Sequence, residues 1–131
     1  MFKIVGIGEV LWDRLPSGKL LGGAPGNFVY HVNRQGADSV VISAIGNDEL
    51  GDDIITTLES LNINSHLQRN NNITGVVDIE IKDCGSAKYD IKVDSAWDHI
   101  EFDNNILELS KECDCVCFGT LAQRAETSRN T

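Results

Sequence analysis

The sequence predicts an α/β fold with a mostly parallel sheet flanked by helices. Short apolar runs rich in β-branched residues are typical of buried strands, and they alternate with segments whose apolar residues recur at helical spacing. In one region the pattern changes to period two on both sides of a glycine-containing turn, which is typical of an antiparallel hairpin. We therefore expect parallel β-α-β units with one antiparallel insertion.

The first half of the chain is expected to form two such units. Pro25 suits the first turn of a helix, where its missing amide hydrogen costs nothing, and Gly36 is placed to end that helix. Asp48 is typical of a residue that caps a second helix, because its side chain can accept hydrogen bonds from the first amides. The predicted strands of this half lie at residues 3–8, 39–45 and 63–68.

The second half begins with the predicted hairpin, whose strands lie at residues 75–81 and 89–93. Asp103 is expected to cap a further helix, and residues 113–119 predict another buried strand. Such a strand normally leads into a crossover helix and a further parallel strand. Because neither is completed, the sequence predicts the N-terminal part of a longer fold whose C-terminal half is absent.

Composition narrows the classes of protein. The chain has 131 residues, of which 41% are apolar and 24% charged, as expected for one globular domain. Asp and Glu outnumber Lys and Arg by 20 to 11, and the net charge of −9 argues against nucleic-acid and anionic-membrane partners. The N-terminus lacks the pattern of a signal peptide, and no apolar run approaches a membrane span. Four cysteines without a secretion signal predict a reducing, cytoplasmic location.

The segment Gly22-Gly23-Ala24-Pro25-Gly26-Asn27 is the first candidate for a binding site. Glycines without a Cβ let backbone amides approach a ligand, and the helix that follows presents further amides. Asn27 offers both a donor and an acceptor, which suits a hydroxyl group. A tight turn before an Ala-Pro helix start explains the same residues, and the segment alone leaves both interpretations open.

Asp13 is the second candidate, because it lies just past a predicted strand end. An ionised carboxylate can accept hydrogen bonds from two neighbouring hydroxyls, which is a common way to hold a sugar. Taken alone, an aspartate in water at the surface explains this residue as well.

Two further patterns are not supported. Gly6-Ile7-Gly8 resembles the start of a dinucleotide-binding loop, but Leu11 stands where the third glycine is needed and no helix begins there. Cysteines at 113, 115 and 117 are expected to place three thiols on one strand face. Because a zinc site needs other spacings and a fourth ligand, we interpret them as small buried apolar side chains and predict no metal site.

A series of motifs runs in order over nearly the whole chain. After Gly22-Gly23-Ala24-Pro25-Gly26-Asn27 come Gly36 and Gly46, and the supporting segments are Gly8-Glu9-Val10-Leu11-Trp12-Asp13, residues 45–51, Thr74-Gly75, Ala96-Trp97-Asp98 and residues 118–124. Together they resemble the N-terminal portion of the PfkB (ribokinase-like) carbohydrate kinases, most closely their fructokinase branch. Gly26 and Val29 depart from the first signature, where Ala and a small residue are usual.

The resemblance implies a ribokinase-like α/β fold with a small β-sheet lid. Residues 1–131 would be the N-terminal part of the kinase domain, with lid segments at about 11–21 and 74–93. Such a lid covers the sugar and excludes water, so that phosphate is transferred to the sugar rather than to solvent. In related kinases the lid is often a dimer contact, which implies a homodimer here.

The resemblance also assigns substrate-binding residues by position. Asp13 and Asn27 would hold sugar hydroxyls, with the backbone of Gly22 and Gly23 against the ring. Ile91 would contact the sugar from the lid. Phe118 and Arg124 would belong to the pocket wall.

By the same resemblance, the whole enzyme would be an ATP-dependent phosphotransferase in sugar metabolism, acting on a primary hydroxyl of fructose or a similar ketose with Mg²⁺ bridging the phosphates. The family's catalytic Gly-Ala-Gly-Asp stretch and its nucleotide and acidic metal motifs lie further along and do not occur here. We therefore expect no catalytic, cofactor-binding or metal residue in this chain, and no kinase activity from it alone. The alternatives are a non-catalytic sugar-binding or dimerisation module, and a related nucleoside or sugar-acid kinase.

Overall fold

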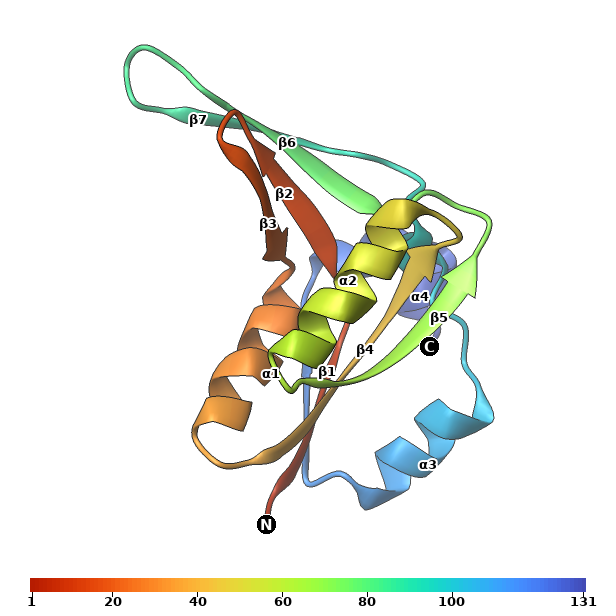
Figure 1. The fold of residues 1–131 in the computed structure, drawn as a ribbon. Coiled ribbons are helices and arrows are strands. Elements are labelled where there is room, and N and C mark those ends of the chain that lie inside the picture. The colour runs from red at the N-terminus through yellow and green to blue at the C-terminus, as the bar shows by residue number, and fades with distance from the viewer.

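Two four-stranded sheets organise the chain, and the computed structural model describes all 131 residues (Figure 1). The core sheet has the order β5-β4-β1-β8 and is entirely parallel. Its strands are β1 (Lys3–Ile7), β4 (Asp38–Gly46), β5 (Asn64–Asn70) and β8 (Cys115–Phe118). The predicted α/β fold with a mostly parallel sheet is confirmed.

The small sheet has the order β3-β2-β6-β7 and projects beyond the carboxyl ends of the core strands (Figure 1). Its strands are β2 (Leu11–Leu15), β3 (Gly18–Gly22), β6 (Gly75–Ile81) and β7 (Ala87–Ile91). The antiparallel β6–β7 hairpin confirms the prediction from the period-two alternation. Strand β2 pairs in parallel with β6, so the sheet is mixed and joins two segments that lie far apart in the sequence.

Helices cover both faces of the core sheet. The helices α1 (Ala24–Arg34) and α2 (Glu49–Ser60) lie on one face, and α3 (Asn104–Glu112) lies on the other (Figure 1). Short helices η1 (Ala96–His99), η2 (Leu121–Arg124) and α4 (Glu126–Arg129) complete the chain. Strand β4 shows why both faces are apolar: Val41 and Ile45 pack beneath α1 and α2, and Ile42 packs on the side of α3.

The predicted helix ends are confirmed. Asp48 Oδ1 accepts a hydrogen bond from the Gly51 amide at 2.8 Å, and Asp103 Oδ1 accepts one from the Ile106 amide at 2.8 Å. Helix α1 ends before Gly36, whose φ of +88° favours glycine.

The prediction that three thiols share one strand face is wrong. Helix α3 extends to Glu112, so Cys113 caps the helix and packs beside the cluster that contains Val5 and Ile42. Strand β8 begins only at Cys115, and Cys117 is the other thiol within it. The helix therefore removes Cys113 from the alternation that the spacing predicts.

The small sheet is joined to the core by four short crossings, at residues 8–10, 23, 71–74 and 92–95. A buried cluster of Leu11, Val77, Trp97 and Ala122 fills the space between them. We call these crossings, with that cluster, the junction.

Asp48 holds one crossing of the junction. Besides capping α2, its carboxylate accepts hydrogen bonds from the Thr74 amide at 2.9 Å and the Thr74 hydroxyl at 2.5 Å. Thr74 Oγ1 in turn accepts a hydrogen bond from the Gly46 amide at 2.9 Å. One carboxylate thus ties the end of β4, the start of α2 and the entry to β6.

Replacing Asp48 by Ala should lower the free energy of unfolding by about 2–3 kcal/mol, because a helix cap is lost and the Thr74 donors are left without their acceptor. Burial alone would raise the pKa of Asp48, but the hydrogen bonds from Thr74 and Gly51 and the nearby Arg69 lower it. This stabilisation is present above the ordinary carboxyl pKa and is lost as the pH falls through the lowered value. Urea unfolding between neutral and acid pH measures it.

Asp48→Asn is the control, because an amide oxygen can still cap the helix. It should lose less stability than Asp48→Ala at neutral pH. Equal stability of the wild type and Asp48→Ala would show that the crossing is held by other contacts.

Candidate binding site at the carboxyl end of the core sheet

The connections of the core sheet diverge at β1. From β1 the chain passes through β2 and β3 to α1 on one face, and the neighbouring β8 is reached from α3 on the opposite face. In open α/β sheets a ligand crevice lies outside the carboxyl ends of the strands at such a point. The residues that follow β1 and β8 are therefore the first place to look for a site.

Asp13 lies in a row of residues across one face of the small sheet. It is aligned with Leu20 of β3 and with Val77 of β6, and Val77 is aligned with Ile91 of β7. Aligned residues of neighbouring strands point to the same side of a sheet. Asp13 and Ile91, both predicted to bind substrate, therefore share one face.

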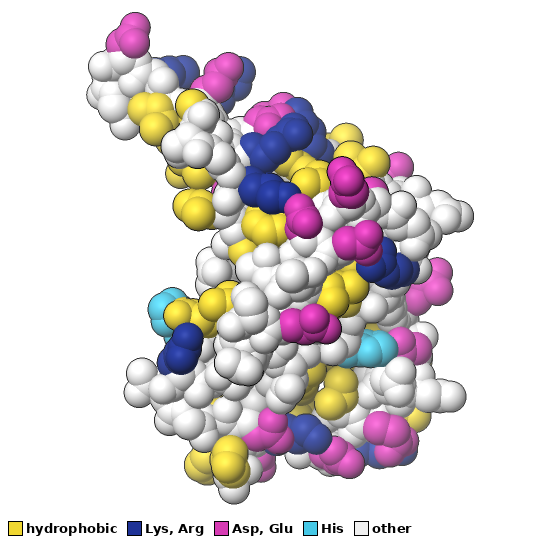
Figure 2. Space-filling view, viewed as in Figure 1, with side chains coloured by type: hydrophobic (Ala, Val, Ile, Leu, Met, Phe, Trp, Pro, Cys, Tyr) yellow, Lys and Arg dark blue, Asp and Glu magenta, His cyan; other side chains and the backbone are white.

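The two faces of the small sheet differ in character. The face of Asp13 is otherwise apolar, whereas the opposite face carries the ion pairs of Asp78 with Arg14 and Lys92. Figure 2 shows the small sheet overhanging a hollow beside α1, with apolar side chains on the overhanging side. A lone carboxylate among apolar side chains is unusual on a solvent-exposed face.

The Asp13 carboxylate is half-buried and has no partner in the chain. Burial alone raises its pKa above the ordinary value, and no hydrogen bond or charge offsets it. Asp48 and Asp103 differ in this respect, because hydrogen bonds lower the pKa of both. A desolvated acceptor without a protein donor is suited to a ligand that brings hydroxyl donors.

The two glycines that lead into α1 make room for this carboxylate and for the chain around it. Any side chain at Gly22 would collide with the Asp13 carboxylate. Gly23 has a φ of +108°, and a side chain there would collide with the Glu9 carbonyl. The fold itself therefore requires both glycines, and the approach of a ligand to their backbone amides stays a prediction.

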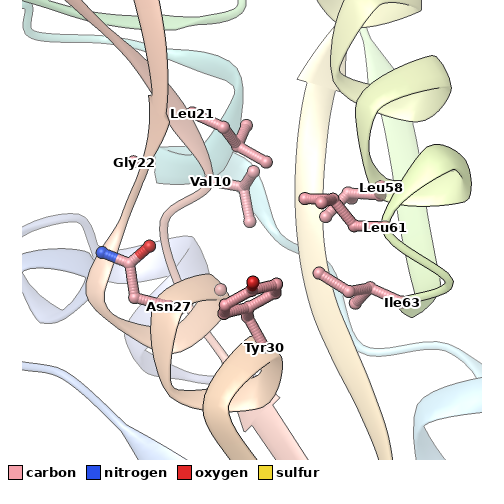
Figure 3. A pocket seen from close by; sticks show the side chains of 9 residues that line it. Val10, Leu21, Gly22, Asn27, Tyr30, Leu58, Leu61 and Ile63 are labelled. Carbon is pink, nitrogen blue, oxygen red and sulfur yellow. The ribbon is translucent and has the colours of Figure 1, made fainter. Parts of the chain in front are cut away.

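Asn27 lies in the first turns of α1 with its side chain exposed. An apolar cavity of about 280 Å³ between α1 and α2 is lined in part by Gly22, Asn27 and Tyr30. Figure 3 shows the Asn27 carboxamide on the side of Gly22, pointing away from Leu58 of α2 and from Leu61, which follows that helix. Its polar atoms are therefore free for a ligand that lies beside the Gly22–Gly23 turn.

The structure places Phe118 and Arg124 differently from these residues. Phe118 is aligned with Ile7 and lines an apolar hollow of about 370 Å³ on the face opposite α1, so it is not brought together with Asn27. Arg124 forms an ion pair with Asp98 at 2.7 Å. The wall positions of both residues stay predictions.

Glu9 is a site residue that the sequence analysis did not identify. It is only 4% exposed, and its Oε1 accepts a hydrogen bond from the Ala24 amide at 3.2 Å. Helix α1 has a glycine cap and no acidic residue in its first turn, so Glu9 supplies the carboxylate that the helix start lacks. The available signal was a charged residue inside the apolar run from Ile7 to Val10.

The parallel sheet, the crevice at its point of divergence and the small mixed sheet joined over it define a ribokinase-like α/β domain. The chain belongs to the pfkB family of carbohydrate kinases, because the model of that family matches residues 18–120.

Individual relatives agree with this assignment. An uncharacterized sugar kinase of Pyrococcus horikoshii is 29% identical over 112 residues, which are 84% of this chain and 36% of that protein. Its crystal structure superposes with a TM-score of 0.85, covering 98% of this chain and 46% of that one. The fructokinase of Halothermothrix orenii is 21% identical, with a TM-score of 0.82 over 99% of this chain and 50% of that one. The chain thus spans half or less of these relatives' length.

Replacing Glu9 by Ala should lower the free energy of unfolding by about 1 kcal/mol, because the first turn of α1 loses its acceptor. Hydrogen exchange of the Ala24 amide should become faster. Glu9→Gln, which keeps an oxygen acceptor, should retain most of the protection. Glu59→Ala, an exposed change on α2, is the control, and unchanged Ala24 exchange in Glu9→Ala would contradict the capping role.

Proposed function

We propose that the chain forms the sugar-binding and lid half of an ATP-dependent sugar kinase, which phosphorylates a primary hydroxyl of a ketose such as fructose. The observation that carries the proposal is the half-buried Asp13 carboxylate, which has no partner in the chain and lies on the face of the small sheet that overhangs the hollow. Membership of the pfkB family supports the sugar as its ligand.

In this proposal the site binds a sugar between the small sheet and the start of α1. Asp13 accepts hydrogen bonds from two neighbouring hydroxyls, and the Asn27 carboxamide binds a third. The Gly22–Gly23 backbone packs against the ring, beside the Asp13 carboxylate that approaches Gly22 closely. Ile91, in the same row as Asp13, contacts the sugar from the lid.

The small sheet acts as the lid of this site. Its apolar face excludes water when it covers the sugar, which protects the transferred phosphoryl group from hydrolysis. The strands of the small sheet fall within or beside the two predicted lid segments.

The other reactants are proposed to bind the remainder of the enzyme. A structure of the Pyrococcus horikoshii relative is a complex with ATP, which supports ATP as the donor. ATP supplies the γ-phosphoryl group, and Mg²⁺ neutralises charge on its phosphates. This chain has no group of three or more His, Cys, Asp or Glu side chains placed to hold a metal ion, so we assign none of its residues to Mg²⁺. We propose that the chain alone has no kinase activity.

We also propose that the lid forms a homodimer. Leu20, Ile81 and Tyr89 lie on the Asp13 face and are 62–64% exposed. Apolar side chains gathered on one face of a sheet are typical of an interface between proteins. A second copy of the lid would cover them.

The proposal also covers the molecule that accepts the phosphoryl group and the cellular compartment of the enzyme. A fructokinase is favoured by the Trp12, Ala96-Trp97-Asp98 and 118–124 motifs, whereas a nucleoside or sugar-acid kinase would keep the chemistry and change the acceptor. No helix in the structure combines the length and apolarity needed to cross a bilayer. We propose a cytoplasmic enzyme, in agreement with the free thiols.

Replacing Asp13 by Asn should weaken sugar binding by about 10- to 100-fold, because hydrogen bonds to a charged acceptor are lost. Titration of the ¹⁵N-labelled chain with fructose, ribose, a nucleoside and a sugar acid, followed by NMR, measures the affinity and selects the acceptor. Asp83→Asn, in the exposed turn between β6 and β7, is the matched control. A folded wild-type chain that binds none of these compounds would overturn the proposal.

Although Asp13→Asn should weaken sugar binding, it should not lower the stability of the fold. Because burial raises the pKa of Asp13, its ionised form opposes folding, and the free energy of unfolding decreases as the pH rises through the raised pKa. At neutral pH Asp13→Asn should therefore be at least as stable as the wild type. Sugar affinity should fall at acid pH, where Asp13 is protonated.

Replacing Tyr89 by Glu should weaken the dimer at least about tenfold, because a charge would be buried in an apolar interface. Analytical ultracentrifugation over a range of concentrations measures this. Lys88→Gln, on the opposite face of β7, should leave the association unchanged. A wild-type chain that stays monomeric at every concentration would refute the lid dimer.

A further inference from the structure

Arg124 connects the end of β8 to the last crossing of the junction. It is the final residue of η2, the short helix that follows β8. Its Nε and Nη2 donate to the two carboxylate oxygens of Asp98, each at 2.7 Å. Nη2 also donates to the carbonyl of Lys92 at 2.7 Å, and Lys92 is the first residue after the lid strand β7.

The carboxylate of this ion pair is buried, whereas the Arg124 side chain keeps 27% of its surface exposed. Asp98 is only 3% exposed, and its Oδ2 also accepts a hydrogen bond from the Ser95 amide at 2.9 Å. The guanidinium stacks on the ring of Trp97, 4.1 Å from its centroid. Charge-assisted bidentate contacts are among the stronger hydrogen bonds in proteins, and the stacked ring covers one face of the cation.

Trp97 extends this contact into the lid. Its side chain is fully buried and packs with Leu11 and Val77, which belong to lid strands. It approaches the backbone of Gly75 so closely that no side chain fits there. The guanidinium and the ring beneath it therefore contact the core side and the lid side of the junction at once.

The crossing held by Arg124 needs such support. Between Lys92 and Ser95 the chain turns through Asp94, which has a φ of +54° in the region that favours glycine. The crossings at Glu9 and Thr74 are held by carboxylates that accept backbone amides. At the crossing after Lys92 a carboxylate also accepts an amide, that of Ser95, and here the Lys92 carbonyl accepts in addition from Arg124 at 2.7 Å and from the Ser95 hydroxyl at 3.1 Å.

We propose that Arg124 is a positioning residue, which fixes the angle of the lid through Asp98 and the Lys92 carbonyl. It holds the row from Asp13 to Ile91 over the crevice and thereby preorganises the site for its ligand. Two of the three guanidinium nitrogens, Nε and Nη2, donate to Asp98 and to the Lys92 carbonyl. Arg124 therefore acts on the ligand through the position of the lid. That the ligand is a sugar rests on the proposed function, whereas the fixed angle does not.

The test is the orientation of the two sheets in the ¹⁵N-labelled chain, measured by residual dipolar couplings. In the wild type one alignment tensor should fit the core sheet and the small sheet together. In Arg124→Met, which keeps an apolar side chain over Trp97, the couplings of the small sheet should be reduced and require a separate tensor. Sugar affinity should fall about tenfold, if the population with a correctly placed lid falls by that factor.

Arg14→Met is the matched control. Arg14 donates to both oxygens of Asp78 at 2.7 and 3.1 Å, but this pair lies within the small sheet, on the face opposite Asp13. It should retain a single tensor and wild-type affinity. Arg124→Lys, which cannot make all three contacts, should lie between Arg124→Met and the wild type.

Arg124→Met leaves Asp98 buried without its cation, which can prevent folding. The double variant Asp98→Asn/Arg124→Met removes that charge, and it should also need two tensors. A single tensor for a folded Arg124→Met or for the double variant would overturn the proposal. Two tensors in a protein that binds no sugar would support the fixed lid angle and refute the proposed substrate.

Discussion

The site depends on how a small sheet is held over the end of a larger one. Only short crossings join the two sheets, and each donates or accepts backbone hydrogen bonds that the junction must satisfy. Glu9, Asp48 and Asp98 accept amides at Ala24, Thr74 and Ser95. A carboxylate suits this place, because two oxygens can accept from several segments at once. The orientation of the small sheet therefore follows from a few carboxylate contacts together with the buried apolar clusters that contain Trp12 and Trp97.

Asp13 differs from these carboxylates. It lies close to the junction and is half-buried, yet no amide, hydroxyl or cation of the chain approaches it. Asp48 is held by Thr74 and Gly51, and its pKa is lowered, whereas that of Asp13 is raised. The same chemical group thus has opposite roles at these two positions. Groups that are satisfied within the fold support it, and a group left unsatisfied is available to a ligand.

Local features of the fold could be predicted from the sequence. Asp48 and Asp103 act on amides three residues further along, so a cap is recognisable from neighbouring residues alone. The row that contains Asp13 and Ile91 could not be derived in this way, because it requires the parallel pairing of β2 with β6. Arg124 and Asp98 are separated by 26 positions and meet only once both sheets are in place. Glu9 was overlooked because its partner, Ala24, lies beyond an entire hairpin.

The contacts of the carboxylates with backbone amides explain part of the acidic composition. An excess of nine negative charges suggests a surface that repels anions. Several of the carboxylates, however, are turned toward backbone amides at helix starts and crossings, and these amide donors offset part of their charge. The Arg124 cation is also used internally, on Asp98. Net charge therefore describes the surface poorly here, and at the crevice the Asp13 carboxylate adds a negative charge that no hydrogen bond or cation of the chain offsets.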